Sequence, residues 1–367
     1  MLVVIVIILL FAALVITHEA GHFIAAKRNG IDVEEFGIGF PPKIWGKKVG
    51  ETLYSINLIP LGGFVRLAGE DTDDNRPGTF GAAKYSVKAK TLLAGVGMNM
   101  LSAVLILFVL CLVGIPALGA QFEPNFLHPT YAQPKQLILV EVESGSPAAN
   151  AGLKSGDYVL RANGTPITQD TQFFNFTKAH AGQKVTLLVQ EGNNQKSLAV
   201  QLRSPKSKQG FLGVETQQVY KLKYGVWQSL VAAVYITVTL FVATVVGVVQ
   251  LILSIPWLIL GLFSSTIPHS AEQASGPLGI FFILQAISSL GYTYIFLFMA
   301  NIAVALGAFN VMPLPALDGG RLAIITYQKL AKKKISADME ARIHAIGFMA
   351  LIGLIVLISV YDIRKRF

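Results

Sequence analysis

Long apolar stretches alternate with polar ones along this chain, and several of them are long enough to cross a membrane. The first has no polar residue from Met1 to Ile16 and continues through His18, Glu19 and His22 to Ala26. A membrane-crossing helix needs about 20 mostly apolar residues, so this window predicts a first span over 1–26. A secretory signal would need a basic start and a small-residue cleavage site, and because neither is present we expect an uncleaved span.

Further apolar stretches predict spans over 92–118, 291–320 and 343–362. The hydrophobic segment 225–290, which contains a Gly-Pro loop, leaves three alternatives open: an interfacial helix, a hairpin that crosses twice, or a re-entrant segment. The expected fold class is a polytopic α-helical membrane protein with about four core spans and a possible extra hydrophobic hairpin.

Charges next to the spans predict their orientation. Lys27 and Arg28 close the first window, which places the polar region 27–91 in the cytoplasm. The loop 321–342, with six basic residues against two acidic ones, is also expected there. The last span then exits outward, which leaves the basic residues 364–366 on the side that the rule disfavours.

Two polar regions predict β-structure. Residues 121–210 contain short apolar runs separated by Gly and Asn turns, which is typical of a small β-rich domain, expected on the outer side of the membrane. Within 27–91, the alternation of Tyr54, Ile56 and Leu58 with polar residues predicts a membrane-associated, re-entrant β-hairpin over 52–68.

Composition agrees with a membrane location. Of 367 residues, 53% are hydrophobic and 14% are charged, whereas soluble proteins average about 25% charged residues. The net charge of +9 fits loops that lie against anionic lipid, so no nucleic-acid partner is expected. The single cysteine, Cys111, excludes an intramolecular disulfide and multi-cysteine zinc sites, so a metal would need His and carboxylate ligands.

The first span carries the pattern H-E-x-x-H at residues 18–22. On a helix, His18 and His22 lie on one face and can share one Zn²⁺, while Glu19 can take a proton from metal-bound water. These three residues are costly inside a membrane unless they bind something, which favours a functional site over mutual hydrogen bonding or a position at the interface near Lys27.

A hydrolytic zinc site needs a third protein ligand. Asp318 is the remaining acidic candidate in apolar surroundings and follows the Pro-rich run 310–317. Prolines and glycines break a helix at membrane depth, which is tolerated where the backbone is buried or lines a cavity. The alternative is that Asp318 caps the next helix. The remaining histidines, at 128, 180, 269 and 344, are expected to be ordinary surface or interface residues.

These motifs together resemble the site-2 protease family of intramembrane zinc metalloproteases (peptidase family M50), most of all its bacterial RseP/RasP-type members with one PDZ domain. The resemblance rests on H-E-x-x-H at 18–22, N-x-x-P-x-P-x-L-D-G at 310–319, and further matches at 54–67, 97–99 and 275–280. It covers most of the chain and departs at 227–263, which is more apolar than the family's usual amphipathic segment.

The resemblance implies one Zn²⁺ per chain held by His18, His22 and Asp318, with Glu19 as the general base. It also implies that Asn310 binds or orients the substrate backbone. An α-helical substrate must unwind before water can attack its carbonyls, so an edge strand that holds the extended segment is expected. We assign that role to Tyr54, Ile56, Leu58, Gly62 and Gly63, the alternative being a hairpin that only seals the cytoplasmic mouth.

The β-rich insert contains the run S-P-A-x-x-A-G-L-x-x-G-D at 146–157, which looks like a PDZ domain, a fold that binds peptides as an added strand. In the family this domain is thought to exclude untrimmed substrates. The alternative is a PDZ fold that only packs beside the gate.

The function expected is a zinc-dependent intramembrane endopeptidase of the inner (cytoplasmic) membrane. Its partners would be single-span substrates, such as a pre-trimmed anti-sigma factor or remnant signal peptides, the lipid bilayer, and a peptide or substrate segment at the PDZ domain. A non-catalytic chaperone or adaptor that uses its PDZ domain, and a metal transporter, are the rival functions. A bacterial membrane is favoured over a plastid one.

Overall fold

The computed structural model describes residues 2–70, 72, 74, 76–118, 121–132, 136–192, 194–206, 210–261, 276, 279–280 and 291–364. The chain divides into two compact units. The membrane unit comprises 1–108, 233–281 and 298–367, and the β unit comprises 109–232 and 282–297.

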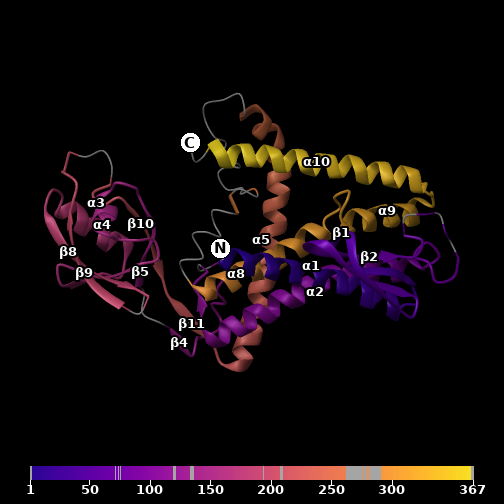
Figure 1. Ribbon diagram of the computed structural model, residues 1–367, viewed down its shortest axis with the longest axis horizontal. Coiled ribbons are helices and arrows are strands. Elements are labelled where there is room, and N and C mark those ends of the chain that lie inside the picture. Colours follow the sequence, from indigo (N-terminus) through magenta and orange to yellow (C-terminus); the bar gives the residue numbers. More distant parts are fainter. Residues whose placement is uncertain are drawn as a thin grey trace. The chain divides into compact units, whose positions relative to one another are not determined.

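Among the described residues, five helices are long and apolar enough to cross a membrane (Figure 1). They are α1 (Leu2–Arg28), α2 (Tyr85–Val113), α5 (Val226–Gly261), α8 (Tyr292–Val311) and α10 (Ala337–Arg364). A shorter amphipathic helix, α9 (Asp318–Ala331), lies between the last two. The polytopic membrane architecture is therefore confirmed.

Helix α5 refines the expected span count. It continues for 36 residues through Pro256 without turning back, so the chain forms no hairpin before Gly261. At 1.5 Å per residue such a helix is about 54 Å long, well beyond the roughly 30 Å of a hydrocarbon core. The rest of the segment that left three alternatives open lies largely outside the described residues.

Two helix ends differ from the expected span limits for local reasons. Helix α2 ends at Val113 rather than 118 because Gly114 takes a φ of +124° and the short strand β3 (Ile115–Pro116) follows. Helix α8 ends at Val311, just before Pro313, whose ring cannot donate a helical hydrogen bond.

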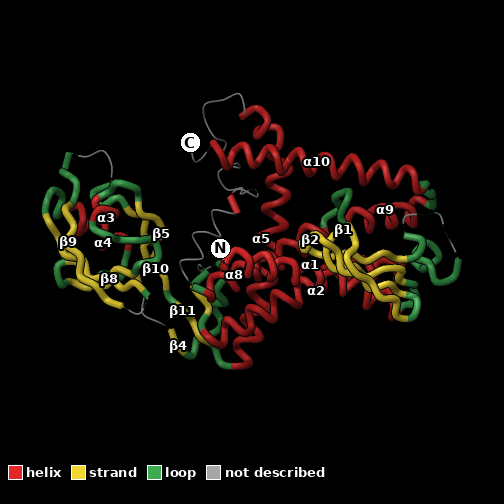
Figure 2. The backbone as a smooth tube through the Cα atoms, viewed as in Figure 1, coloured by secondary structure: helices red, strands yellow, loops and turns green. Residues whose placement is uncertain are grey.

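The strands β1 (Val33–Val49) and β2 (Thr52–Leu67) form a two-stranded sheet in which each strand pairs along more than one stretch (Figure 2). Residues 35–38 pair both with 63–66 and with 53–56, and 53–56 pair also with 45–48. Two stretches are therefore inner and two, 43–49 and 63–67, are outer. The expected hairpin within 52–68 is wrong in this respect, since both halves of β2 pair with β1.

The β unit contains a six-stranded sheet in the order β10, β5, β6, β8, β9, with β7 added to β6. Its members are β5 (Gln136–Val142), β6 (Tyr158–Ala162), β7 (Thr165–Pro166), β8 (Lys184–Glu191), β9 (Asn194–Gln201) and β10 (Val214–Val219). Because β10 pairs with β5, this domain extends beyond residue 210. A three-stranded sheet joins β3, β4 (Tyr131–Ala132) and β11 (Lys221–Lys223).

Two helices, α3 (Pro147–Asn150) and α4 (Asp170–Ala179), complete this domain. The hydroxyl of Ser146 caps α3 by accepting from the Ala149 N–H, which accounts for the Ser-Pro start of the motif at 146–157. The core consists of apolar side chains such as Leu139, Leu187 and Phe173, all nearly inaccessible to solvent.

The end of α10 holds a buried carboxylate that the sequence analysis passed over. Asp362 Oδ2 accepts hydrogen bonds from the backbone N–H groups of Gly276 and Gly279, both 2.9 Å long. Two residues on, the Arg364 guanidinium donates to the Gly261 carbonyl at the end of α5. A cation at a helix C-terminus is favourable, which gives Arg364 a local role independent of the charge rule that it opposes.

Candidate metal centre

Two imidazoles and one carboxylate meet at a single point in the membrane unit. One donor atom each from His18, His22 and Asp318 lies within 4.8 Å of the others. The Nε2 atoms of the two histidines are 3.1 Å apart, and Asp318 Oδ2 lies 3.1 Å from one and 3.2 Å from the other. Two ligands held about 2.0–2.1 Å from one tetrahedral Zn²⁺ would be roughly 3.3 Å apart, so the donor set fits this ion.

Hydrogen bonds on the far side of each ring orient the histidines. His22 Nδ1 lies 2.8 Å from the Thr91 carbonyl oxygen, which can only accept, so this nitrogen carries the proton and Nε2 is left free as a ligand. His18 Nδ1 lies 3.1 Å from the side-chain amide of Asn99.

The orientation of the Asn99 amide supplies a second test of the metal hypothesis. As placed, its nitrogen faces His18, and its buried Oδ1 finds no hydrogen-bond partner among the described residues. Exchanging the amide oxygen and nitrogen would let Oδ1 accept from a protonated Nδ1, leaving His18 Nε2 to bind the metal. The local chemistry therefore suits two neutral imidazoles that bind through Nε2.

A close contact between α1 and α2 makes room for this arrangement. A Cβ atom on Gly95 would lie 2.4 Å from His22 Nε2 and 2.6 Å from a ring carbon of His18. One on Gly21 would lie 2.5 Å from the Ala94 carbonyl oxygen. Small residues let membrane helices approach closely, and here they also leave space for the imidazole rings. Sequence reasoning noted 97–99 only as a family match and missed Thr91 and Gly95 altogether.

Asp318 lies where a turn leads into helix α9. It is the first residue of α9, its side chain turns to the two histidines, and the helix cap is Leu317, which makes no side-chain capping bond. The capping alternative for Asp318 is therefore not what the structure shows. Ala316, two residues before Asp318, has a positive φ of +73°, a conformation that costs free energy in any residue but glycine.

Neighbouring residues hold this turn in place. A Cβ on Gly319 would lie 2.2 Å from the Met312 carbonyl oxygen, so only glycine fits there. The Ala316 N–H donates to His344 Nδ1 over 2.8 Å. His344, expected to be an ordinary surface or interface residue, is instead half-buried against the turn that carries Asp318. Of the other histidines, His128 and His180 lie in the β unit, and His269 is outside the described residues.

Glu19 borders a small pocket beside the three donor atoms. The pocket has a volume of about 90 Å³ and is lined by Glu19, His22, Val65, Leu67, Glu70, Leu92 and Asp318. Val65, on the stretch 63–67, lines the same pocket as Glu19. Because a water molecule occupies about 30 Å³ in the liquid, the pocket has room for a few waters or one peptide group.

The residues expected to bind substrate fall into two groups. Asn310 Nδ2 lies 3.3 Å from His18 Nε2, so Asn310 belongs to the centre. Gly63 also lies close to the centre, since a Cβ added to it would be 3.8 Å from Glu19 Cγ. A Cβ added to Gly62 would be 2.9 Å from the Val15 side chain.

The other group lies away from the donor atoms. The ring of Tyr54 packs against Phe23 and Phe36. Ile56, which ends the inner stretch 53–56 of β2, and Leu58, which follows it, are both exposed. The outer stretch that reaches the centre is 63–67.

Known proteins resemble this chain over most of its length. The family described as "Peptidase family M50" matches residues 6–354 of the chain. A Clostridium perfringens protein named as a candidate zinc metalloprotease is 31% identical over 358 residues, covering 97% of each chain. The zinc metalloprotease RasP of Geobacillus kaustophilus is 28% identical, covering 98% of this chain and 97% of its own. The regulator of sigma-W protease RasP of Bacillus subtilis is 26% identical, covering 98% of both. The chain therefore belongs to peptidase family M50, the site-2 proteases, and is a membrane zinc metalloprotease.

Proposed function

We propose that this chain binds one zinc ion through His18, His22 and Asp318 and cleaves the membrane segments of single-span proteins. The observation that carries the proposal is the set of three donor atoms spaced 3.1–3.2 Å apart within a membrane-spanning unit. Bound there, Zn²⁺ would polarise the scissile carbonyl and lower the pKa of a water molecule to about 7.

Glu19 is the group placed to move protons. Its carboxylate borders the same pocket as His22 and Asp318, so it can accept a proton from the attacking water and return it to the leaving amine. Glu70 lines this pocket too, but its carboxylate is engaged by the Arg321 guanidinium. Of these two glutamates, Glu19 is therefore the base that we propose.

We assign substrate holding to Asn310 and to the outer stretch 63–67. The Asn310 amide, next to His18, can donate to a peptide carbonyl. Among the described residues, the stretch 63–67 pairs with β1 on one side only, and its Val65 lines the pocket that Glu19 borders. An unwound substrate added along 63–67 would bring a peptide bond to the base. We therefore assign the substrate-binding edge to this stretch and no longer to Tyr54, Ile56 and Leu58.

Cross-linking tests this choice of edge. A substrate with one cysteine near its cleaved bond should form a disulfide with Arg66→Cys, on the stretch 63–67, and not with Lys47→Cys, on the opposite outer stretch. Both positions are exposed, and the native Cys111 is fully buried, so background reaction should be low. Cross-linking at Lys47→Cys alone would refute strand addition at 63–67.

We infer that the β unit is a PDZ domain on the extracytoplasmic side of a bacterial inner membrane. Support comes from edge strand β10, which follows the glycine-containing run 210–213 and lies close to the start of α4, since Gln218 donates to the Thr168 carbonyl. A peptide or substrate segment could add along β10. In that role the domain would select substrates already trimmed outside the membrane, such as anti-sigma factors or remnant signal peptides.

Replacement of Glu19 by Gln tests the protease assignment most directly. Gln keeps the size of the side chain and removes the base, so cleavage of a tagged single-span substrate should be lost while zinc content stays at one per chain. Glu34→Gln, at an exposed position on β1, is the matched control and should cleave normally. Equal cleavage by the wild type and Glu19→Gln would contradict the assignment and favour a non-catalytic adaptor.

A further inference from the structure

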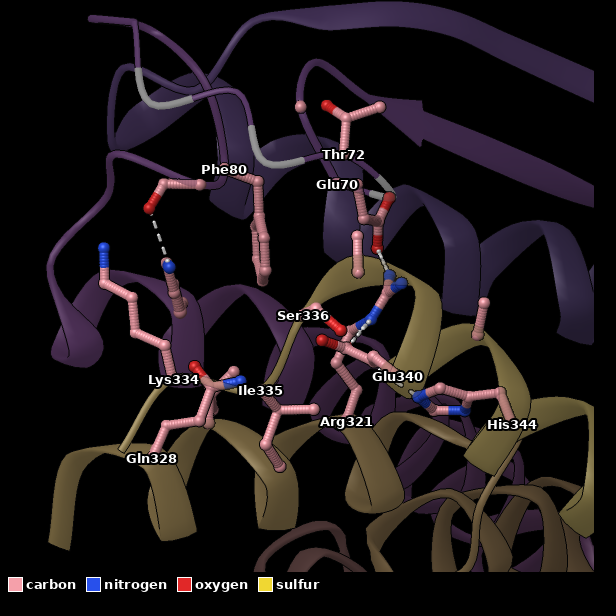
Figure 3. A pocket seen from close by; sticks show the side chains of 16 residues that line it. Glu70, Thr72, Phe80, Arg321, Gln328, Lys334, Ile335, Ser336, Glu340 and His344 are labelled. Carbon is pink, nitrogen blue, oxygen red and sulfur yellow. Dashed lines mark hydrogen bonds and ion pairs between the residues drawn. The ribbon is translucent and has the colours of Figure 1, made fainter. Parts of the chain in front are cut away.

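A second, larger cavity lies beside the catalytic pocket in the membrane unit (Figure 3). It has a volume of about 630 Å³ and is bounded by the segment that follows β2, by the start of α2, by α9 and by the start of α10. Its charged and titratable side chains are Glu70, Lys88, Arg321, Lys334, Glu340 and His344. Glu70 lines both this cavity and the catalytic pocket, so it stands at the boundary between them.

One guanidinium at this boundary joins three parts of the chain. Arg321 Nη1 pairs with Glu70, and its Nε donates to Glu340 Oε1 over 3.3 Å. In Figure 3 the side chain of Arg321 extends from α9 toward Glu70 and lies next to Glu340. The three side chains are only 17–21% exposed. Such partly buried charges depend on one another, because removing one takes a partner from a charge that water solvates poorly.

The sequence positions of these residues connect the pair to the metal centre. Arg321 follows Asp318 by three residues, about one turn of α9, and Glu70 follows the end of the stretch 63–67 by three residues. The remaining link runs from Glu340 to His344, whose Nε2 is 3.8 Å away and whose Nδ1 accepts from the Ala316 N–H. The network therefore contacts the turn before Asp318 as well as the helix after it.

We propose that Glu70 and Arg321 are positioning residues that fix the distance between the substrate-holding stretch 63–67 and the metal ligand Asp318. Neither touches the reacting atoms in this scheme; each acts through the backbone next to it. The proposal rests on the proposed roles of Asp318 and of 63–67. Because a misplacement of about 1 Å can cost roughly 100-fold in rate, an ion pair that sets this spacing should affect turnover more than binding.

Kinetics of Glu70→Gln, Arg321→Gln and the double variant, measured with a single-span substrate, test the proposal. We expect kcat to fall at least about tenfold in each single variant with KM changed little. The double variant should be no slower than Arg321→Gln alone, because the pair acts as a unit. Arg321→Lys should recover only part of the rate, since one ammonium cannot reproduce two separate N–H directions.

Asp74 and Arg76 offer the matched control. They form an ion pair in the same connecting segment, but Arg76 is 83% exposed and neither residue lines the cavity. Asp74→Asn and Arg76→Gln should therefore leave kcat unchanged. Zinc content and thermal unfolding, measured on every variant, separate a positioning defect from a failure to fold.

Several results would overturn the proposal. Unchanged kcat in both Glu70→Gln and Arg321→Gln would do so, as would losses that simply multiply in the double variant. A rate loss that follows a lowered unfolding temperature in proportion would assign the pair to stability alone. A separate result concerns the proposed function: if Asp318→Ala keeps its zinc and its activity, Asp318 is not a metal ligand, whatever the variants of Glu70 and Arg321 show.

Discussion

The membrane unit packs polar atoms around His18 and His22, whereas the domain in the β unit is centred on a cluster of apolar side chains. Around His18 and His22 the neighbours are a backbone carbonyl, an amide and a glycine placed where a single methyl group would clash. In the β unit, Leu139, Leu187 and Phe173 fill the corresponding space. One interior is arranged for chemistry and the other for stability, so substitutions in the two should fail in different assays.

The largest effect is expected for Gly95→Ala. The new methyl group would need the space of both imidazole rings, so the rings must shift, and cleavage should fall about 100-fold or more while the β unit stays folded. Gly97→Ala, two residues along the same helix, has open space at its Cβ position and should cleave normally. Substrate cleavage and zinc content measure both. Normal zinc binding and turnover in Gly95→Ala would show that the contact is less tight than described.

An intermediate effect, on the stability of the β unit and not on cleavage, is expected for Leu187→Ala. The side chain is fully buried in the β-unit core, and such truncations typically cost about 2–5 kcal/mol of unfolding free energy. Thr186→Ala, its exposed neighbour on β8, should stay within about 1 kcal/mol of the wild type. Pulse proteolysis in urea reports both values. Loss of zinc from Leu187→Ala would show that the two interiors are not independent.

The smallest effect is expected at the surface of the β unit, from Glu191. Hydrogen bonds from Lys154 and Lys196 lower the pKa of this carboxyl from 4.5 to about 2. Because the folded pKa is depressed, the stabilisation is present above pH 4.5 and is lost as the pH falls toward 2. Hydrogen exchange in the β8–β9 hairpin, measured between pH 5 and pH 2, should show this loss. The loss of protection at low pH should be weaker in high salt and absent in Glu191→Gln. A pH dependence unchanged by the substitution would contradict this role of Glu191.

The sequence predicted the parts of the site that follow local rules. The spacing of His18 and His22 fixes their common helix face, and the Pro-rich run before Asp318 marks the end of a helix. It could not predict which backbone carbonyl or amide supports each ring, because Thr91 and Asn99 come from another helix and an Asn or Thr in an apolar span has no distinctive pattern. The Asn310 contact came from family resemblance rather than from pattern.

Strand pairing was the least predictable feature. Alternation along 54–58 correctly indicated a strand, but period-two patterns do not say which neighbour a strand has. The structure places residues 53–56 between two partners and leaves 63–67 on the outside. Tyr54 was expected at a substrate edge and instead packs against Phe23 of α1, since an aromatic side chain suits a strand core as well as an exposed edge.

His18 and Asp318 are separated by 300 positions in the chain, which has a consequence for biosynthesis. At roughly 5–20 residues per second, a ribosome needs about 15–60 s to make the segment between them. During that interval the first helix can enter the bilayer with two imidazoles but without the carboxylate. The three proposed metal ligands therefore cannot come together beside the nascent spans until nearly all of the spans have been made.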